Sequence, residues 1–526
     1  MLLFFSPLLV SAATYYVATT GSDTNSGTQD QPWRTIQKAA NDMATGDTVI
    51  VQAGDYSAER VKVTKSGNSG TPITYQAQGT VVMKGFKITA SYITVKGFEI
   101  ANTDYVRWHP DVSSGVYILG DHVVVEDNYI HDSSLNGITL VGSPAANNTL
   151  TTHDCIIRNN RLYRNEMVGI DVSGRNNLIE GNEVWGSVQC HPAVVAVEGS
   201  GCPDYVAVGG LDADGMRFFG SGHIFRKNNI HDIHYGPPGI NPAIEDYIDD
   251  AHIDCFQTWQ GTYNEVASNI LFEQNYCENL QLQASAENGH AWMLSGGANN
   301  LYIINNIIKA YGGINTGGTG NANYLYIYNN IWINNLSFQQ FWPHAIGLAN
   351  VSYAVVKNNI FYDQPYHTIF SSGTAVNQDI DYNLAYNSDG STPDCFRVVN
   401  FACKSPAPTH DVWKVDPKFV SPGTGDYHLQ AGSPAIDAGA VVAVSDDYDG
   451  NSRPRGASYD IGAFEYAGGA VCVAADLNCD TKVDVSDLIF VAQDFGKTTG
   501  YNSKSDTNND GIVDIFDVVF VASRFT

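Results

Sequence analysis

The chain has 526 residues, and 28 Lys and Arg against 55 Asp and Glu give it a net charge of −27. This balance argues against nucleic acid partners and a polybasic membrane anchor, because few basic side chains are available to pair with phosphate groups. Only 16 % of the residues are charged, and 50 are Gly. Disordered chains and coiled coils carry more charge and less glycine, so the composition predicts a folded chain rich in strands and turns.

The start of the chain predicts an export signal. Residues 2–10 are apolar, and the small residues 11–13 that follow suit a signal-peptidase site. The run is too short to cross a bilayer, and no other stretch is long and apolar enough to do so. We expect residues 1–13 to be a signal peptide and the mature protein to be secreted.

Secretion makes disulfides possible among the nine cysteines, and the odd number leaves at least one thiol unpaired. Three pairs are close enough in sequence to tie loops together: Cys190/Cys202, Cys395/Cys403 and Cys472/Cys479. For the other three, buried free thiols are an equally good interpretation: Cys155, Cys255 and Cys277.

A short amphipathic helix is predicted near the N-terminus. Residues 30–32 (DQP) form a helix start signal, and apolar residues then recur on one face at Ile36, Ala39, Ala40 and Met43. Such a helix can cover the open end of the structure that the following strands build.

From about residue 120, one pattern repeats: a short apolar strand, an Asn and a second apolar strand, as in VVVEDNYIHD and HIFRKNNIHD. One such coil cannot bury its own inner face, whereas stacked coils bury a continuous core and pair their backbone edges. An Asn at the same inward turn of each coil can bond to the Asn of the next coil. The repeat therefore predicts a parallel β-helix. Its recurring amides, 22 to 47 residues apart, are Asn128, Asn160, Asn182, Asn228, Asn275, Asn306, Asn330 and Asn359.

These segments resemble the right-handed parallel β-helix superfamily of secreted polysaccharide lyases and glycosidases, over residues 14–466. The opening at 15–56 and the segments SPAIDAG (433–439) and DIGAFEY (460–466) are similar to the first and closing parts of such proteins. The resemblance implies an all-β, single-stranded solenoid capped by the N-terminal helix. It also implies an enzyme that degrades a polysaccharide.

Aligning the strands that precede the Asn strands arranges side chains in columns. One column is apolar and must face the core: Ile138, Ile170, Met216, Phe256, Trp292, Ile314 and Ile346. The next position along each strand must then face outward: Thr139, Asp171, Arg217, Gln257, Met293 and Asn315. Before each strand, Asp214, Asp254 and His290 form a third column, with Asp212 and His252 two residues upstream. Because neighbouring coils lie about 5 Å apart, we expect these polar residues to share one exposed patch.

The catalytic candidates in this patch are Asp214, Asp254, His290, Arg217 and His252. A glycoside hydrolase needs one protonated and one ionised carboxyl group, and Asp214 and Asp254 on successive coils meet that need. A lyase instead neutralises a uronate carboxylate, often with Ca²⁺, and removes the C5 proton with a base. His252, His290 or Arg217 would then handle charge or protons, and the candidate ligands of the ion are Asp212, Asp214, Asp249, Asp250 and Asp254.

The candidate substrate-binding residues are Asp171, Gln257, Phe219 and Trp259. The two rings are expected to share the outward face and to stack on sugar rings. Two long inserts, 186–211 and 233–251, fall beside the same coils, where they would build the walls of a binding face. Other interpretations stay open: the stacked column is also typical of a structural ladder, and turn caps suit three of the acids equally well: Asp171, Asp212 and Asp249.

The run ADG (213–215), followed by DDAHID (249–254), resembles the calcium-site segments of family-nine pectate lyases. In that family an Asp-Asp pair is followed by a third Asp, and a Lys is the base. In this chain the spacing differs by one residue, and the matching coil carries His290 instead of Lys. The resemblance implies a calcium-assisted lyase, while the differences leave pectate and the lysine mechanism open.

Residues 467–526 carry two similar acidic loops, DLNCDTKVDVSD from 476 and DTNNDGIVDIFD from 506, each followed by an apolar helical segment. A repeated ligand spacing argues against a plain acidic tail, and the pair is similar to a type I dockerin. This resemblance implies an all-α calcium-binding domain whose partner is a cohesin on a scaffold. Oxygen-bearing side chains stand at loop positions one, three, five, nine and twelve, as Ca²⁺ requires: Asp476, Asn478, Asp480, Asp484 and Asp487, then Asp506, Asn508, Asp510, Asp514 and Asp517.

The sequence thus predicts a secreted enzyme that cleaves an acidic polysaccharide by calcium-assisted β-elimination and docks to a scaffold through its last domain. A glycoside hydrolase is the first alternative, since a charge of −27 disfavours a polyanion unless bound Ca²⁺ changes the local field. A non-catalytic, carbohydrate-binding surface protein is the second alternative.

Overall fold

A computed structural model gives the structure of most of the chain. The residues it describes are 12–104, 106, 109–142, 152–187, 213–233, 253–260, 265–278, 289–310, 312–316, 322–333, 344–364, 367–372, 377–391, 395–399, 402–404, 410–466, 475, 477, 483–498, 505–508 and 511–525.

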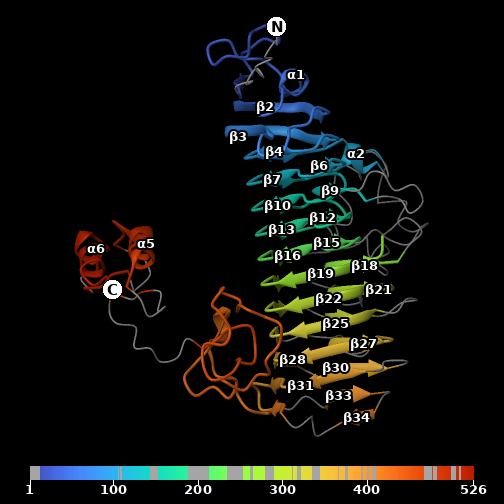
Figure 1. Ribbon diagram of the computed structural model, residues 1–526, viewed down its shortest axis with the longest axis vertical. Coiled ribbons are helices and arrows are strands. Elements are labelled where there is room, and N and C mark those ends of the chain that lie inside the picture. The colour runs from blue at the N-terminus through green and yellow to red at the C-terminus, as the bar shows by residue number, and fades with distance from the viewer. Residues whose placement is uncertain are drawn as a thin grey trace, which may run out of the picture.

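The described strands wind into a parallel β-helix whose coils stack along one axis (Figure 1). Three parallel sheets, here called A, B and C, run along the stack, and each strand pairs with the equivalent strand of the next coil. Sheet A holds β4 (Ile93–Lys96), β7 (Val124–Glu126), β10 (Ile156–Arg158), β13 (Leu178–Glu180), β16 (Ile224–Arg226), β19 (Ser268–Glu273), β22 (Asn299–Ile304), β25 (Asn323–Tyr328), β28 (Ala354–Lys357) and β31 (Gln378–Asp381).

Sheets B and C are built in the same way. Sheet B holds β5 (Glu99–Ala101), β8 (Tyr129–His131), β11 (Arg161–Tyr163), β14 (Glu183–Trp185), β17 (Asn229–His231), β20 (Tyr276–Glu278), β23 (Ile307–Lys309), β26 (Ile331–Ile333), β29 (Ile360–Tyr362), β32 (Leu384–Tyr386) and β35 (Val412–Trp413). Sheet C, which carries the candidate site, holds β6 (Val116–Ile118), β9 (Ile138–Leu140), β12 (Val168–Val172), β15 (Asp214–Phe218), β18 (Ile253–Trp259), β21 (Gly289–Ser295), β24 (Gly312–Asn315), β27 (His344–Ala349), β30 (His367–Ser372) and β33 (Cys395–Val399).

The first coils are made of β1 (Thr14–Val17) and the long strands β2 (Thr48–Val63) and β3 (Ile73–Ile88). The predicted helix is confirmed as α1 (Ile36–Asp42), which lies at this end of the stack (Figure 1). The helix begins at Ile36, after the start predicted at residues 30–32, because the side chain of Thr35 caps it by accepting a hydrogen bond from the backbone N–H of Lys38. Its predicted apolar face is buried. A further short helix is α2 (Pro110–Ser113).

The predicted amide ladder is confirmed and runs through the interior. From Asn128 to Asn359, each Nδ2 donates to Oδ1 of the next Asn at 2.9–3.1 Å. The second Nδ2 hydrogen goes to a backbone carbonyl, as from Asn160 to Val125 at 2.8 Å. Two further rungs were not predicted: Asn383, which accepts from Asn359 at 3.0 Å, and Asp411, which accepts the backbone N–H of Asn383. Because each buried amide is paired, the ladder fixes the register of the coils.

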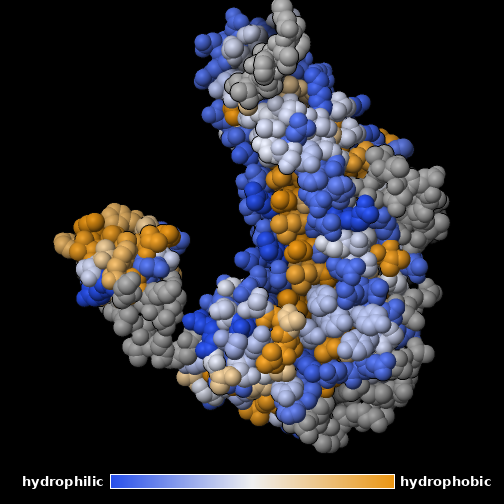
Figure 2. Space-filling model, in the orientation of Figure 1, coloured by the Kyte–Doolittle hydropathy of each residue, from blue (hydrophilic) through white to orange (hydrophobic). Residues whose placement is uncertain are grey.

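The core follows from the same register. The predicted apolar column is confirmed, since its members pair across sheet C and are fully buried: Ile138, Ile170, Met216, Phe256, Trp292, Ile314 and Ile346. On the outer face of sheet A, partly exposed apolar side chains also align from coil to coil: Val124, Ile156, Leu178, Ile224 and Leu271. Figure 2 shows a hydrophobic stripe running along these strands beside a hydrophilic flank.

Residues 410–466 return along the outer side of sheet B and include β36 (Phe419–Ser421), the 3-10 turn η2 (Pro422–Thr424) and β37 (Asp426–Leu429). The two predicted closing segments belong here: Ala435, Ile461 and Phe464 pack with outward apolar residues of sheet B. A buried ion pair between Arg453 and Glu465, at 2.7 Å, holds this region together. At the lower end of the stack, β34 (Ala402–Lys404) pairs antiparallel with β33.

The C-terminal region contains two helices, α5 (Val485–Asp494) and α6 (Ile515–Ala522). Each begins with a capping box, in which Asp484 pairs with Asp487 and Asp514 pairs with Asp517. A small apolar cluster joins the two helical segments. In the part of the chain that the structure describes, every helix is too short or too polar to span a membrane.

Candidate functional site

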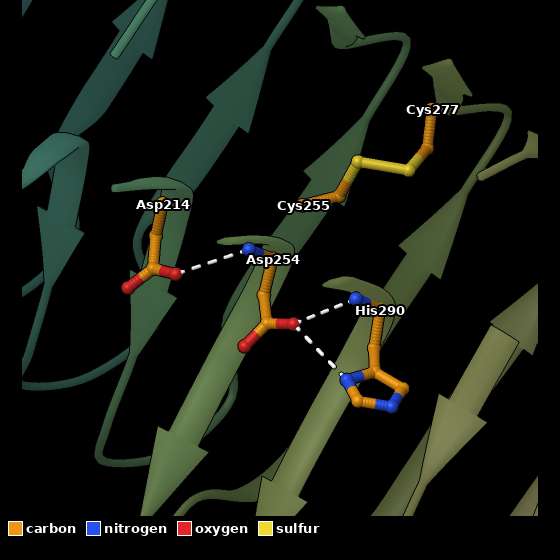
Figure 3. Close-up of a disulfide and its surroundings, with 5 residues drawn as sticks. All are labelled: Asp214, Asp254, Cys255, Cys277 and His290. Atoms are coloured by element: carbon orange, nitrogen blue, oxygen red, sulfur yellow. Dashed lines mark hydrogen bonds and ion pairs between the residues drawn. A yellow bond between two sulfur atoms is a disulfide. The ribbon is translucent and has the colours of Figure 1, made fainter. Parts of the chain in front are cut away.

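Three residues of the predicted third column come together at the edge where sheet C strands begin (Figure 3). Asp254 and His290 are register partners on β18 and β21. The backbone N–H of Asp254 donates to Asp214 Oδ1 at 3.2 Å, and the backbone N–H of His290 donates to Asp254 Oδ1 at 2.8 Å. The row Asp214–Asp254–His290 is therefore continuous over three coils.

The exposure predicted for the two acids is wrong. Asp214 and Asp254 are fully buried, whereas 15 % of the His290 side chain is exposed. The reason is local, since each carboxylate accepts a backbone N–H of the next coil and so lies against the neighbouring strand. Asp254 Oδ2 is buried and has no hydrogen-bond partner among the described residues. An unpaired buried carboxylate oxygen is costly, and such atoms are typical of sites that bind a ligand.

The His290 ring has a neighbour at each nitrogen. Nδ1 lies 3.4 Å from Asp254 Oδ1 but makes no hydrogen bond within the described residues, and Nε2 lies 3.2 Å from Nδ2 of Asn315 on β24. Because an amide N–H only donates, the contact with Asn315 places the lone pair of the ring on Nε2. Sequence reasoning put Asn315 in the outward column but did not identify it as a partner of His290.

Arg217 is the cation of the row. Its Nε donates to Asp214 Oδ2 at 2.7 Å, and only 4 % of its side chain is exposed. Its guanidinium lies over the ring of Trp259, 4.9 Å from the centroid.

Asp171 is the register partner of Arg217 on β12. Burial raises the pKa of Asp171 to about 6, although Arg217 and a 3.3 Å hydrogen bond from Asn136 oppose this rise. Its Oδ1 atom is buried without a hydrogen-bond partner among the described residues. Asp171 is thus a carboxyl group that changes charge in a mildly acidic range.

The outward column is in register, as predicted, but most of it is not exposed. Arg217, Gln257 and Met293 are 3–8 % exposed. Phe219 is also buried, with its ring perpendicular to that of Trp259 at 4.8 Å, so it cannot stack on a sugar as predicted. Only Trp259 of the two rings keeps partial exposure. Part of the column is covered because the guanidinium of Arg217 lies over the ring of Trp259, which also packs against Phe219.

A disulfide joins the residue next to Asp254 to sheet B. Cys255 on β18 is bonded to Cys277 on β20, 22 residues away (Figure 3). The free-thiol interpretation is therefore wrong for these two cysteines and confirmed for buried Cys155. The side chains of Asp254 and Cys255 alternate across the strand, so one lines the site while the other crosses the core.

Several predicted residues lie outside the part of the chain that the structure describes. They are the candidate active-site residues Asp212, Asp249, Asp250 and His252, the loop residues Asp476, Asn478, Asp480 and Asp510, most of the signal peptide, and Cys190, Cys202, Cys472 and Cys479. Cys395 and Cys403 lie on the described strands β33 and β34, but their side chains are not described.

The described acids fit a calcium ion in part. Asp214 already accepts from Arg217 with one oxygen and from the backbone of Asp254 with the other. Asp254 Oδ2 is the described oxygen best placed to bind an ion. Because Ca²⁺ takes six to eight oxygens, a site here needs the predicted ligands outside the described residues.

The described parts of the C-terminal loops fold around their last acid. Asp517 Oδ1 accepts the backbone N–H of Thr507 at 2.7 Å, and Asp487 Oδ1 accepts that of Leu477 at 2.7 Å. Both acids are fully buried. Gly511 has a φ of 88°, the left-handed conformation that a sharp loop turn requires. The two loops therefore share one geometry around position twelve.

Parts of the chain are similar to known β-helix proteins and to pectate lyases. Residues 15–185 match a family model described as Pel9A-like, right handed beta helix region. The chain is 31 % identical over 132 residues to the uncharacterized protein YwoF of Bacillus subtilis, a match that covers 22 % of this chain and 28 % of that protein. It is 25 % identical over 207 residues to pectate lyase PEL9 of Emericella nidulans, which covers 34 % and 48 % of the two chains.

Among solved structures, the crystal structure of pectate lyase Pel9A is similar, with a TM-score of 0.48, 18 % identity and coverage of 87 % of this chain and 97 % of that one. The chain spans less than half the length of the curated relatives that it matches. The family match covers about a third of the chain and describes a right handed beta helix region, which agrees with the parallel coils of the structure.

Proposed function

We propose that this protein is a polysaccharide lyase that cleaves an acidic, uronate-containing polysaccharide by β-elimination on sheet C. The observation that carries the proposal is the row Asp214–Asp254–His290, in which the buried Asp254 lies between the His290 imidazole and Asp214, the partner of the buried guanidinium of Arg217. The similarity to pectate lyase PEL9 of Emericella nidulans supports the same reaction class.

Each residue of the row has a role in this reaction. Once the substrate displaces the Asn315 amide from His290 Nε2, the lone pair of Nε2 takes the C5 proton of the uronate, the C4–O bond then breaks, and a double bond forms between C4 and C5. The departing oxygen takes up a proton from water. Arg217 lies one coil from Asp254. To offset the charge of the uronate carboxylate, and so make the C5 proton easier to remove, its guanidinium must exchange Asp214 for the substrate. Asp254 holds the main chain of His290 in place.

Calcium is part of the proposal. When bound, the ion would supply positive charge at the uronate carboxylate, beyond that of Arg217. Its proposed ligands are Asp254, through the oxygen that has no described partner, together with Asp212, Asp249 and Asp250. Asp214 can be a further ligand only if its carboxylate gives up the hydrogen bond from Arg217.

We also propose that the protein is secreted and that its C-terminal region is a type I dockerin that binds calcium and a cohesin-bearing scaffold. The disulfide between Cys255 and Cys277 supports an oxidising compartment. The two matching capping boxes support paired calcium loops. Exposed apolar side chains on α5 and α6 support a partner surface: Val485, Ile489, Ile515, Phe516 and Val519 are 54–67 % exposed.

A glycoside hydrolase is the second candidate, because Asp214 and Asp254 lie on adjacent coils and are linked through one hydrogen bond. Both oxygens of Asp214 are already occupied, however, so this residue is poorly placed to give or take a proton. That contact pattern favours the lyase.

The test is incubation of the protein with polyuronates, with and without a chelator. A lyase yields an unsaturated product that absorbs in the ultraviolet, whereas a hydrolase yields new reducing ends without that absorbance. His290→Ala and Asp254→Asn should lower the rate by about 10²–10⁴-fold, the usual worth of general base catalysis. His231→Ala, which removes a carboxylate-bonded histidine from sheet B, is the matched control and should keep full activity.

A non-catalytic carbohydrate-binding protein would give a different result. Such a protein would bind polyuronate without cleaving it, so there would be no reaction rate for Asp254→Asn or His290→Ala to lower. Turnover that collapses in these two variants while binding is retained would exclude that alternative. Turnover that is unaffected by both substitutions would refute the proposed site.

A further inference from the structure

A second chemical cluster lies at the corner between sheets C and A. Asp121 and His122 precede β7, and His153 and Asp154 precede β10, so acid and imidazole alternate on neighbouring coils. The backbone N–H of His122 donates to the carbonyl of His153 at 3.0 Å, which fixes the two coils to each other. The candidate active site lies at the other edge of sheet C, where the strands begin, so the cluster is separate from it.

Three ligand atoms of this cluster converge. His122 Nδ1 lies 3.2 Å and His153 Nε2 lies 3.4 Å from Asp121 Oδ2. All three atoms lie within 4.8 Å of one another. Ligand atoms around a tetrahedral Zn²⁺ ion, with bonds of about 2.0–2.1 Å, are about 3.3–3.4 Å apart. Two of the three separations therefore already suit a coordinated ion. Within the described ranges of the chain, this is the single group of three such side chains.

Further contacts orient these ligands. His153 Nδ1 lies 2.8 Å from Asp154 Oδ2, so the carboxylate holds the proton on Nδ1 and leaves the Nε2 lone pair toward Asp121. The other oxygen of Asp121 accepts from the hydroxyl of Ser91. The ring of Tyr92 stacks on that of His122, with centroids 4.5 Å apart. A carboxylate on the outer nitrogen of a ligating histidine is the usual support of protein zinc sites.

We propose that Asp121, His122 and His153 bind Zn²⁺ or another late first-row divalent ion, with water in the fourth position. Two imidazole nitrogens favour such ions over Ca²⁺, which takes oxygen ligands. The three side chains are 31–37 % exposed, so an ion and a water molecule can reach them. The bound ion would link the coil of β7 to the coil of β10.

The test is calorimetric titration of the full chain with Zn²⁺ in the presence of excess Ca²⁺, which keeps the acidic C-terminal loops occupied. We expect the protein to bind one more equivalent of Zn²⁺ than the double variant His122→Ala/His153→Ala. The matched control is His428→Ala. His428 also contacts two carboxylates, Asp426 and Asp449, but on opposite ring nitrogens, so it cannot share one ion with them. This variant should keep the extra equivalent.

A graded variant and a spectrum complete the test. Asp154→Asn keeps all three ligands and should weaken Zn²⁺ binding about 10–100-fold. Co²⁺ bound to the unaltered protein should show the intense visible bands of a four-coordinate ion, and the double variant should not. Equal Zn²⁺ stoichiometry in the protein and the double variant, or Co²⁺ bands that are absent from the unaltered protein, would overturn the proposal.

Discussion

Asp254 Oδ1 accepts the backbone N–H of His290 at 2.8 Å and lies 3.4 Å from Nδ1 of the same residue. One oxygen thus fixes the main chain of His290 by a hydrogen bond and lies close to its ring. Asp214 holds the main chain of Asp254 in the same manner, one coil earlier. Because these contacts follow the register of stacked strands, the position of the imidazole is set by the whole solenoid rather than by one loop. A site built on such rigid elements is well suited to catalysis.

The buried ion pair between Arg217 and Asp214 should be important for stability. Arg217→Ala leaves Asp214 buried without its guanidinium, and we expect the free energy of unfolding to fall by about 3–5 kcal/mol. The control is Arg226→Ala, which breaks the partly exposed pair with Glu180 and should cost about 0–1 kcal/mol. Denaturant unfolding at neutral pH measures both values. A loss at Arg217 no larger than that at Arg226 would contradict the prediction.

The raised pKa of Asp171, about 6 against an ordinary 3.8, makes stability depend on pH. The folded state holds the proton more tightly than the unfolded state. Protonation of Asp171 therefore stabilises the fold at low pH, and this contribution is lost as the pH rises through about 6. Asp171→Asn should gain about 1–3 kcal/mol relative to the unaltered protein between about pH 4 and pH 7. Urea unfolding at the two pH values tests this, and a constant difference would argue against it.

The disulfide next to Asp254 should stabilise both the fold and the site. Cys255 and Cys277 close a loop with a sequence separation of 22, and removing such a cross-link by Cys255→Ala/Cys277→Ala should cost about 3 kcal/mol. We also expect lower activity, because Asp254 would lose the anchor of its neighbour. Cys155→Ala is the control, since it removes a buried sulfur but no cross-link. Thermal unfolding without reductant compares them, and equal losses would speak against a special role of the disulfide.

Calcium removal should loosen the C-terminal region but not the β-helix. Asp487 and Asp517 are fully buried at position twelve of their loops, and without a cation the acids around them repel one another. We expect a chelator to speed proteolytic cleavage within 467–526 while the β-helix resists. Asp517→Ala should be cleaved quickly even when Ca²⁺ is present. An unchanged cleavage pattern after chelation would rule out calcium as the stabilising ligand.

The repeating parts of the fold were predictable because the interior repeats. Each coil must offer an apolar residue and an Asn at the same inward positions, so the columns of Ile138 and Asn128 are visible in the sequence even though the inserts between coils vary in length. The pairing of Asp254 with His290 followed from the same alignment. Asn383 was missed because its neighbours (DYNLAY) carry a weaker apolar signal than the other Asn strands.

Contacts across a corner, and burial, were not predictable in this way. Cys255 and Cys277 lie on different sheets of one coil, and no repeat relates them. The zinc-site candidates carry a signal, since Asp-His at 121–122 and His-Asp at 153–154 stand 32 residues apart and each directly precedes a strand, yet their convergence depends on the local turn. The burial of Asp214 depends on its hydrogen bond to the next coil, and that of Phe219 on its packing against Trp259; the periodic pattern specifies neither.

The final rung of the interior ladder limits how far that ladder can extend. Each Asn uses one amide hydrogen on a carbonyl and the other on its neighbour, as Asn160 does. Asp411 replaces that amide with a carboxyl group, which has at most one hydrogen and cannot repeat the arrangement. A further coil with an inward Asn could therefore not extend the amide ladder past this rung in the same way. The change from nitrogen to oxygen at Asp411 limits the ladder to the coils that precede it.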